Sequence, residues 1–165
     1  MHLAVISPAS NIYKLFLFLH IASAIVGFGA VTLNGVYANK ALKRADGEAT
    51  AVTEVNFEVS KIGEFAIYAV FVFGLIVGIL GNNHGLKFSD AWLSIAMVLY
   101  IIGIGVSHAI VIPAHRKMGE LLRAGDRGAQ FEAAFKRTAA GGAFLNLLLA
   151  VILFLMILKP GGATI

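Results

Sequence analysis

Residues 12–37, IYKLFLFLHIASAIVGFGAVTLNGVY, form the stretch that decides the fold of this chain. Its only charged residue is Lys14, and a helix of about 20 predominantly apolar residues is enough to cross the hydrocarbon core of a bilayer. Three further apolar stretches follow, at residues 62–81, 91–113 and 141–158. None of the four alternates between apolar and polar residues as the strands of a membrane β-barrel do. The sequence therefore predicts an all-α protein, a four-helix transmembrane bundle that forms a single domain over residues 1–165.

The overall composition is that of a membrane protein. Charged residues make up only 13% of the chain and hydrophobic residues 59%, whereas a soluble domain carries about 25% charged residues. There is no cysteine, which excludes disulfides, thiolate metal sites and iron–sulfur clusters. The segment Ala22-Ser23-Ala24 resembles a signal-peptide cleavage site, but no lysine or arginine precedes Lys14 and the apolar run continues beyond it. We therefore expect the first stretch to be a retained membrane span.

The basic residues divide unequally between the two sides of the predicted bundle. Ten flank or occupy the connections between the first and second and between the third and fourth stretches: Lys40, Lys43, Arg44, Lys61, Arg116, Lys117, Arg123, Arg127, Lys136 and Arg137. The opposite side has Lys14, Lys87 and Lys159. Short loops rich in lysine and arginine stay cytoplasmic, so we expect both termini on the periplasmic side of a bacterial inner membrane. No basic and aromatic interleaving typical of a nucleic-acid surface is present, and no nucleic-acid partner is expected.

Small and polar residues share one predicted face of the first stretch, at the three-to-four spacing of a helix: His20, Ser23, Ala24, Gly27, Val31 and Asn34. The third stretch has a similar series at Ile101, Gly105, His108, Ile112 and His115. In the second stretch, Gly74 and Gly78 lie four residues apart, a pattern typical of close helix packing in membranes. Residues 41–60 and 114–136 mix charged with apolar positions and are predicted to be partly helical extensions of the spans.

His20 is the first candidate for a functional side chain, because ionisable residues inside membrane spans face a bundle interior or a cavity. An inward-facing histidine can be the axial ligand of a b-type haem, with His20 as the metal ligand. The alternative is a neutral histidine that is hydrogen-bonded to a neighbouring helix. His84, which follows the second stretch on the same side, is a candidate second haem ligand.

His108 is the second intramembrane histidine and has three interpretations: a haem ligand, a proton relay, or a residue at the lipid headgroups. At 1.5 Å per residue, His20 lies roughly 14 Å inward from Asn11 and His108 roughly 26 Å inward from Ala91. This difference of about 12 Å is large beside metal–imidazole bonds of roughly 2 Å. A single metal held between the two histidines is therefore disfavoured.

Several polar residues are predicted at the depth of His108. A carboxylate, a histidine and two amides at one level could form a hydrogen-bonded network or a proton entrance. The members of this possible network are Asn34, Glu64, Tyr68, His108 and Asn146. The alternative for Glu64 is an interfacial residue paired with Lys61.

Two segments carry a family resemblance. The first is KLFLFLHI at residues 14–21, followed by the glycine-containing stretch to Gly35. The second runs from AWL at residues 91–93 through VLY at 98–100 to VIP at 111–113, and ends in HRK at 115–117. Together they resemble an uncharacterised family of predicted four-span bacterial integral membrane proteins. That family is grouped loosely with the CopD-like copper-resistance membrane proteins and the HemJ-type protoporphyrinogen oxidases.

The resemblance implies a haem at His20, because a first-span histidine serves as haem ligand in the HemJ-like relatives. Those relatives also place a functional lysine near the start of the third span, where this chain has WLSIA at residues 92–96 and no lysine. This departure argues against protoporphyrinogen oxidase activity. A copper function is disfavoured as well, since the spans lack cysteine and a methionine cluster.

Three function classes remain open from the sequence. The first is a redox or electron-transfer membrane protein with one b-type haem on His20. The second is a cofactor-free accessory subunit, because the small size and glycine-rich faces favour a homo-oligomer or a larger membrane complex. The third is a small proton-conducting or transport protein that uses Glu64 and His108. No nucleotide loop, zinc-protease motif or serine-nucleophile motif is present, so the chain is not expected to be an enzyme on its own.

Overall fold

The computed structural model of the chain describes residues 10–82 and 87–160, and helices occupy nearly all of them. The elements are α1 (Asn11–Leu42), α2 (Asp46–Gly81), α3 (Ala91–Val106), the π-helical turn η2 (Ser107–Val111), α4 (Ile112–Arg123) and α5 (Ala129–Leu158). Together α3, η2 and α4 form one long helical segment, so the described residues make four such segments and contain no strand. The predicted all-α, four-helix architecture is confirmed.

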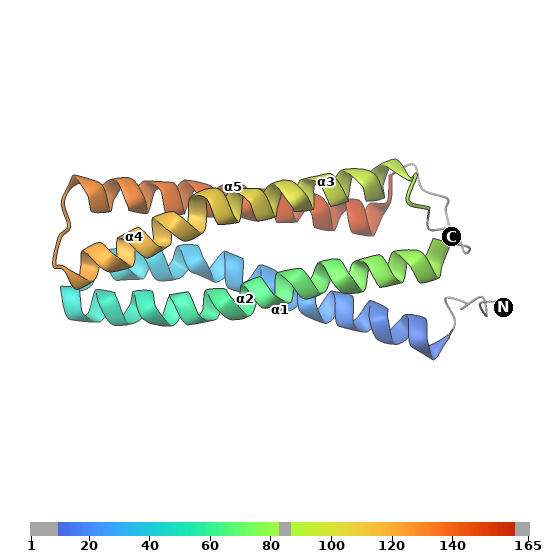
Figure 1. Cartoon of the computed structure of the whole chain (residues 1–165), viewed down its shortest axis with the longest axis horizontal. Helices are drawn as coiled ribbons and strands as arrows, with labels where there is room; N and C mark the ends of the chain where they lie inside the picture. The colour runs from blue at the N-terminus through green and yellow to red at the C-terminus, as the bar shows by residue number, and fades with distance from the viewer. Residues whose placement is uncertain (1–9, 83–86, 161–165) are drawn as a thin grey trace.

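The helices associate as two pairs (Figure 1). α1 and α2 run side by side along the bottom of the view, and α3 and α5 run along the top. α4 slopes from the upper pair towards α2 at the left-hand end, where it packs against both α2 and α5. In contrast, no Cα atom of α2 lies within 8 Å of one in α3. The two pairs are therefore closed at one end and separated along the α2–α3 side.

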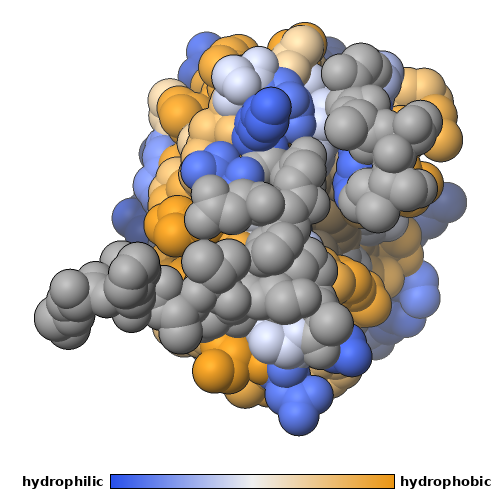
Figure 2. All heavy atoms as spheres, turned by 90° about the vertical axis from the view of Figure 1, so that its right-hand side faces the viewer, coloured by the Kyte–Doolittle hydropathy of each residue, from blue (hydrophilic) through white to orange (hydrophobic). Residues whose placement is uncertain are grey.

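The outer surface of the bundle is apolar. Each of the four helical segments contains a stretch long and hydrophobic enough to cross a membrane. Large hydrophobic side chains point outward, among them Phe18 with 66% and Phe65 with 77% of its surface exposed. Viewed from the end where α1 begins, hydrophobic side chains lie on several sides of the outline (Figure 2). Exposed apolar side chains on every helix are what a lipid-embedded bundle requires, because lipid replaces water around it.

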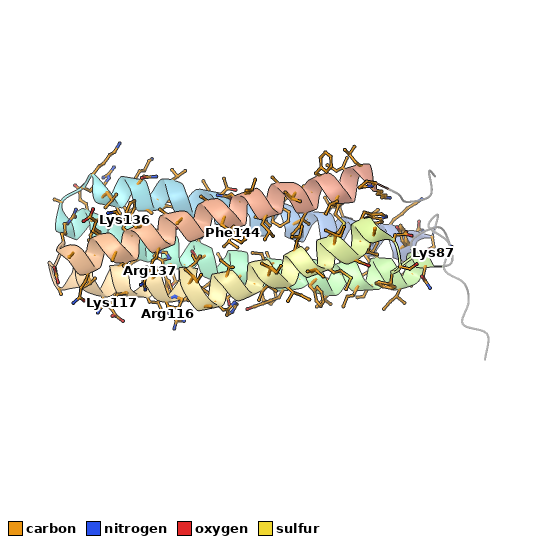
Figure 3. The ribbon with its side chains drawn as sticks, turned by 90° about the horizontal axis from the view of Figure 1, so that it is seen from above. Lys87, Arg116, Lys117, Lys136, Arg137 and Phe144 are labelled. Atoms are coloured by element: carbon orange, nitrogen blue, oxygen red, sulfur yellow. The ribbon has the colours of Figure 1, made fainter. Side chains whose placement is uncertain are left out.

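One end of the bundle extends beyond the predicted apolar stretches and carries most of the basic residues. Figure 3 shows Arg116, Lys117, Lys136 and Arg137 towards this end and Lys87 at the other. The predicted helical extensions are confirmed, since α2 begins at Asp46 and α4 continues to Arg123. A compact hydrophobic core holds the helices together here, formed by Ala41, Ala49, Met118, Leu121, Leu122, Phe131 and Ala134.

Pro113 accounts for the π-helical turn in the third segment. Its ring has no N–H and clashes with the carbonyl four residues earlier in a regular α-helix. η2 widens the helix just before it, and the N–H of Ile112 donates to the carbonyl of Ser107, five residues back. Pro113 then lies in the first turn of α4, where a proline is tolerated.

The π turn changes which helix face meets the core. Before it, Trp92 and Ala96 are buried, while Ile101 is 60% exposed. After it, His115 is buried. A π turn holds more residues than an α turn, so a stripe spaced for one continuous α-helix cannot stay on the inside across it. The predicted interior series in the third stretch is therefore wrong for its first three members, Ile101, Gly105 and His108, which are exposed.

The predicted face of the first stretch is confirmed. None of its six members is fully exposed, and Gly27 is buried. A Cβ on Gly27 would lie 2.9 Å from Cγ1 of Ile67, and one on Gly63 would lie 2.4 Å from the Cβ of Ala30. These two glycines allow α1 and α2 to approach closely, as small residues do between membrane helices.

Candidate functional site

His20 packs in a notch of the neighbouring helix α2. Its Nδ1 lies 2.8 Å from the carbonyl oxygen of Val70, which can only accept, so Nδ1 carries the proton. A Cβ on Gly74 would lie 2.9 Å from Cε1 of the imidazole, so the ring occupies the space that a side chain at Gly74 would need. Nε2 has no hydrogen-bond partner among the described residues and keeps its lone pair.

Glu64, Tyr68 and His108 form a hydrogen-bonded cluster between α2 and η2. Oη of Tyr68 lies 2.9 Å from Oε1 of Glu64 and 2.8 Å from Nε2 of His108. Nε2 of His108 and Oε1 of Glu64 are 3.2 Å apart. Glu64 and Tyr68 are one helical turn apart on α2, and the π-helical turn directs His108 towards them. All three therefore contact one another directly.

The geometry limits where the protons of this cluster reside. Nδ1 of His108 lies 3.0 Å from the carbonyl oxygen of Ile104, so it is protonated. When His108 is neutral, Nε2 accepts from the Tyr68 hydroxyl, and a protonated Glu64 donates to that hydroxyl. When His108 is positively charged, the direction reverses and Glu64 is a carboxylate. The two states contain the same number of protons and differ in the position of one of them, which the Tyr68 hydroxyl can pass between Glu64 and His108.

The two asparagines predicted to join this network have other partners. Asn34 accepts a hydrogen bond from the hydroxyl of Ser60, with 2.9 Å between the oxygens. Asn146 accepts one from Thr32 at 3.1 Å, which links α5 to α1. Of the five predicted members, the structure brings together the three ionisable or phenolic ones and leaves both amides outside.

A cavity of about 160 Å³ lies beside the Glu64 cluster. Glu64, Tyr68 and His108 line it together with Asn34. Its wall also includes Ser60, Lys61, Tyr100, Gly103, Ile104, Ser107, His115, Arg116 and Leu148. Since Lys61 and Arg116 border the apolar stretches on the basic side, the cavity extends from the cluster towards that side. His20 does not line it.

Asn56 and His115 form a second polar pair, which the sequence did not single out as a site. Both side chains are buried, and His115 lines the same cavity. Asn56 is 1% exposed and His115 6%, and Nδ2 of Asn56 lies 3.4 Å from Nε2 of His115. Oδ1 of Asn56 has no partner. His115 was placed on the predicted series of the third stretch, but Asn56 lies in a segment that the sequence marked only as a mixed extension. The sequence carried no signal for this pair beyond the asparagine itself in a mixed segment.

The two other predicted haem ligands are His84 and His108. His84 lies outside the described residues. Within residues 10–82 and 87–160 there is no group of three or more histidine, aspartate or glutamate side chains that could hold a metal ion. His20 and His108 bond to different groups of α2: His20 to the carbonyl of Val70, and His108 to the hydroxyl of Tyr68.

A comparison of the sequence with protein-family models identifies one match, over residues 14–160, to a family described as predicted integral membrane protein (DUF2269). The chain belongs to this family. The match covers all four helical segments and every candidate residue from His20 to Asn146. Together with the four membrane-crossing helices, it makes the protein a multi-pass integral membrane protein that lies in a lipid bilayer. No curated protein and no solved structure shows significant similarity to the chain.

Proposed function

We propose that the protein binds and conducts protons within the membrane, through the cluster of Glu64, Tyr68 and His108. The observation that supports this is the pair of short contacts around the Tyr68 hydroxyl, which joins a carboxylate to an imidazole inside a membrane-crossing segment. Ionisable residues in such segments are costly and characteristically mark proton relays or ion pathways. A site that holds one mobile proton between two groups has the chemistry of a relay.

The cavity supplies access for water. A volume of about 160 Å³ is enough for several molecules, since each occupies about 30 Å³ in the liquid. Polar side chains that could bond such waters are present at Asn34, Ser60 and His115. We further propose that the basic end faces the cytoplasm of a bacterium, because lysine and arginine favour that side, so that the cluster exchanges protons with the cytoplasm.

Proton flux into reconstituted liposomes tests this function. An imposed pH gradient should dissipate faster with the protein than without it, and Glu64→Gln should return the rate to that of protein-free liposomes. Tyr68→Phe should slow the flux less, because Nε2 of His108 still lies 3.2 Å from Oε1 of Glu64. The matched control is Glu58→Gln on the same helix, whose carboxylate pairs with Lys61 and does not line the cavity. Equal flux with the wild type and with Glu64→Gln would rule out the relay.

A haem on His20 is the second candidate function, favoured by the bond between Nδ1 of His20 and the carbonyl of Val70. Ligating histidines characteristically donate their other ring N–H to such a carbonyl, which leaves Nε2 free to bind the metal. His20 therefore fits the chemistry of one axial ligand. A bound haem would supply one-electron transfer. The purified protein, expressed with adequate haem, should then show a Soret band that His20→Ala removes, and a colourless preparation would exclude this function.

A further inference from the structure

The lining of the cavity indicates which kind of molecule the Glu64 cluster can bind. We propose that the cavity binds the oxygen-bearing ring of a quinone dissolved in the bilayer, with the ring oxygens at Tyr68 and His108. The inference deepens the proposed proton function and rests on it for its purpose, since a bound quinone would place hydrogen-bonding oxygens beside the groups that share the mobile proton. The binding itself follows from the size, polarity and accessibility of the cavity.

The size of the cavity matches a single six-membered ring. Its volume is about 160 Å³, and a cavity of roughly 150 Å³ in a protein interior holds benzene. Much of the wall is apolar or aromatic, with Tyr100, Ile104 and Leu148 among its residues. Flat rings bind well between such side chains, and a few polar groups then fix their orientation.

The polar groups suit a ring that carries oxygen. The side chains of Glu64 and His108 remain 40% and 47% exposed, so their polar atoms are accessible. A quinone carbonyl can accept a hydrogen bond from the hydroxyl of Tyr68 or from a protonated Nε2 of His108, and a quinol hydroxyl can donate to the carboxylate of Glu64. A lipid acyl chain offers none of these bonds.

The route from the bilayer that we propose runs along the seam between α2 and α3. α2 and α3 have no close Cα approach, and side chains alone bridge the seam between them. Tyr100 donates to the carbonyl of Ile67 and stacks on Phe71 with ring centroids 5.5 Å apart. A hydrophobic quinone can therefore enter sideways between the two helix pairs, where lipid already surrounds the protein.

Equilibrium binding of decylubiquinone to the protein in lipid nanodiscs tests the proposal. Saturable binding of one molecule per chain is expected, and Tyr68→Phe should weaken it about tenfold, as expected for one lost hydrogen bond. Gly103→Val should also weaken it, because Gly103 lines the cavity and a Cβ there meets only ordinary contacts with Leu148 and Leu145. Gly105→Val is the matched control. It lies on the same helix, meets nothing within 4 Å and does not line the cavity.

Two outcomes would overturn the proposal: absence of saturable binding to the wild type, and equal affinity of the wild type, Tyr68→Phe and Gly103→Val. Circular dichroism of each variant shows whether it has folded, and Gly103→Ala is the milder variant if Gly103→Val has not. Failure of quinone binding is distinguishable from failure of the proton function. If proton flux depends on Glu64 but no quinone binds, only the proposal of quinone binding is contradicted. Quinone binding without proton flux contradicts only the conduction proposal.

Discussion

His20 and His108 are both histidines of membrane-crossing helices, yet their surroundings differ in kind. His20 bonds to a backbone carbonyl and fills a notch at Gly74. His108 bonds to two side chains that can themselves gain or lose protons, and it lines a cavity. Nδ1 of both imidazoles donates to a backbone carbonyl, which fixes the tautomer, but only Nε2 of His108 meets a tyrosine and a carboxylate, between which a proton can move. The partner, rather than the histidine, therefore decides what each position can do.

Among variants that test the surroundings of the two histidines, Gly74→Val is expected to change the stability of the protein most. The new side chain would overlap the imidazole of His20, whose Cε1 lies 2.9 Å from the position of a Cβ at Gly74. Overpacking of this kind should destabilise the protein by about 3 kcal/mol, measured by denaturation in mixed detergent. Gly29→Val, where a Cβ meets nothing within 4 Å, is the control. Equal stability of the two variants would show that the notch is not tightly filled.

A smaller effect is expected when the imidazole itself is removed. His20→Ala should cost about 1–2 kcal/mol, from one lost interhelical hydrogen bond and the space left behind. His108→Ala should cost less, because that side chain is half exposed. In the double variant Gly74→Val with His20→Ala, valine takes the space of the ring. It should therefore be more stable than Gly74→Val alone, and strict additivity of the two single effects would contradict the packing described.

The smallest expected effect concerns the bond between Thr32 and Asn146. Hydrogen bonds between membrane helices average about 0.6 kcal/mol in double-mutant cycles, and this one joins two neutral side chains. The coupling between Thr32→Ala and Asn146→Ala should be of that size. Neither variant should change proton flux, since Asn146 has no bond to the Glu64 cluster. A loss of flux in Asn146→Ala would contradict this expectation and would support the larger network that the sequence predicted.

The sequence predicted the fold well because the bilayer imposes strong constraints. Apolar stretches of spanning length and the spacing of His20, Gly27 and Asn34 on α1 were sufficient to predict four helices and one packed face. The meeting of Glu64 with His108 was also predicted from depth alone. Depth along a helix axis does not give the angle around it, so it could not exclude Asn34 and Asn146 from that network.

The third helical segment was the least predictable part. Its face was derived from one helical period, but η2 interrupts that period just before Pro113. Pro113 was visible in the sequence, but a proline alone does not distinguish a break in the helix from a wider turn. The burial of Asn56 beside His115 could not be predicted either, since it depends on α4 crossing towards α2.

The π-helical turn also makes the position of His108 sensitive to the deletion of a single residue. A turn of this type accommodates one more residue than the α-helix around it, so deletion of a single residue within Ser107–Val111 would let the segment become a continuous α-helix. The helix on either side would keep its faces, and the side chains of the turn itself, His108 among them, would change direction. In an alignment of relatives, a one-residue gap at this point would mark proteins in which the histidine and the carboxylate no longer meet.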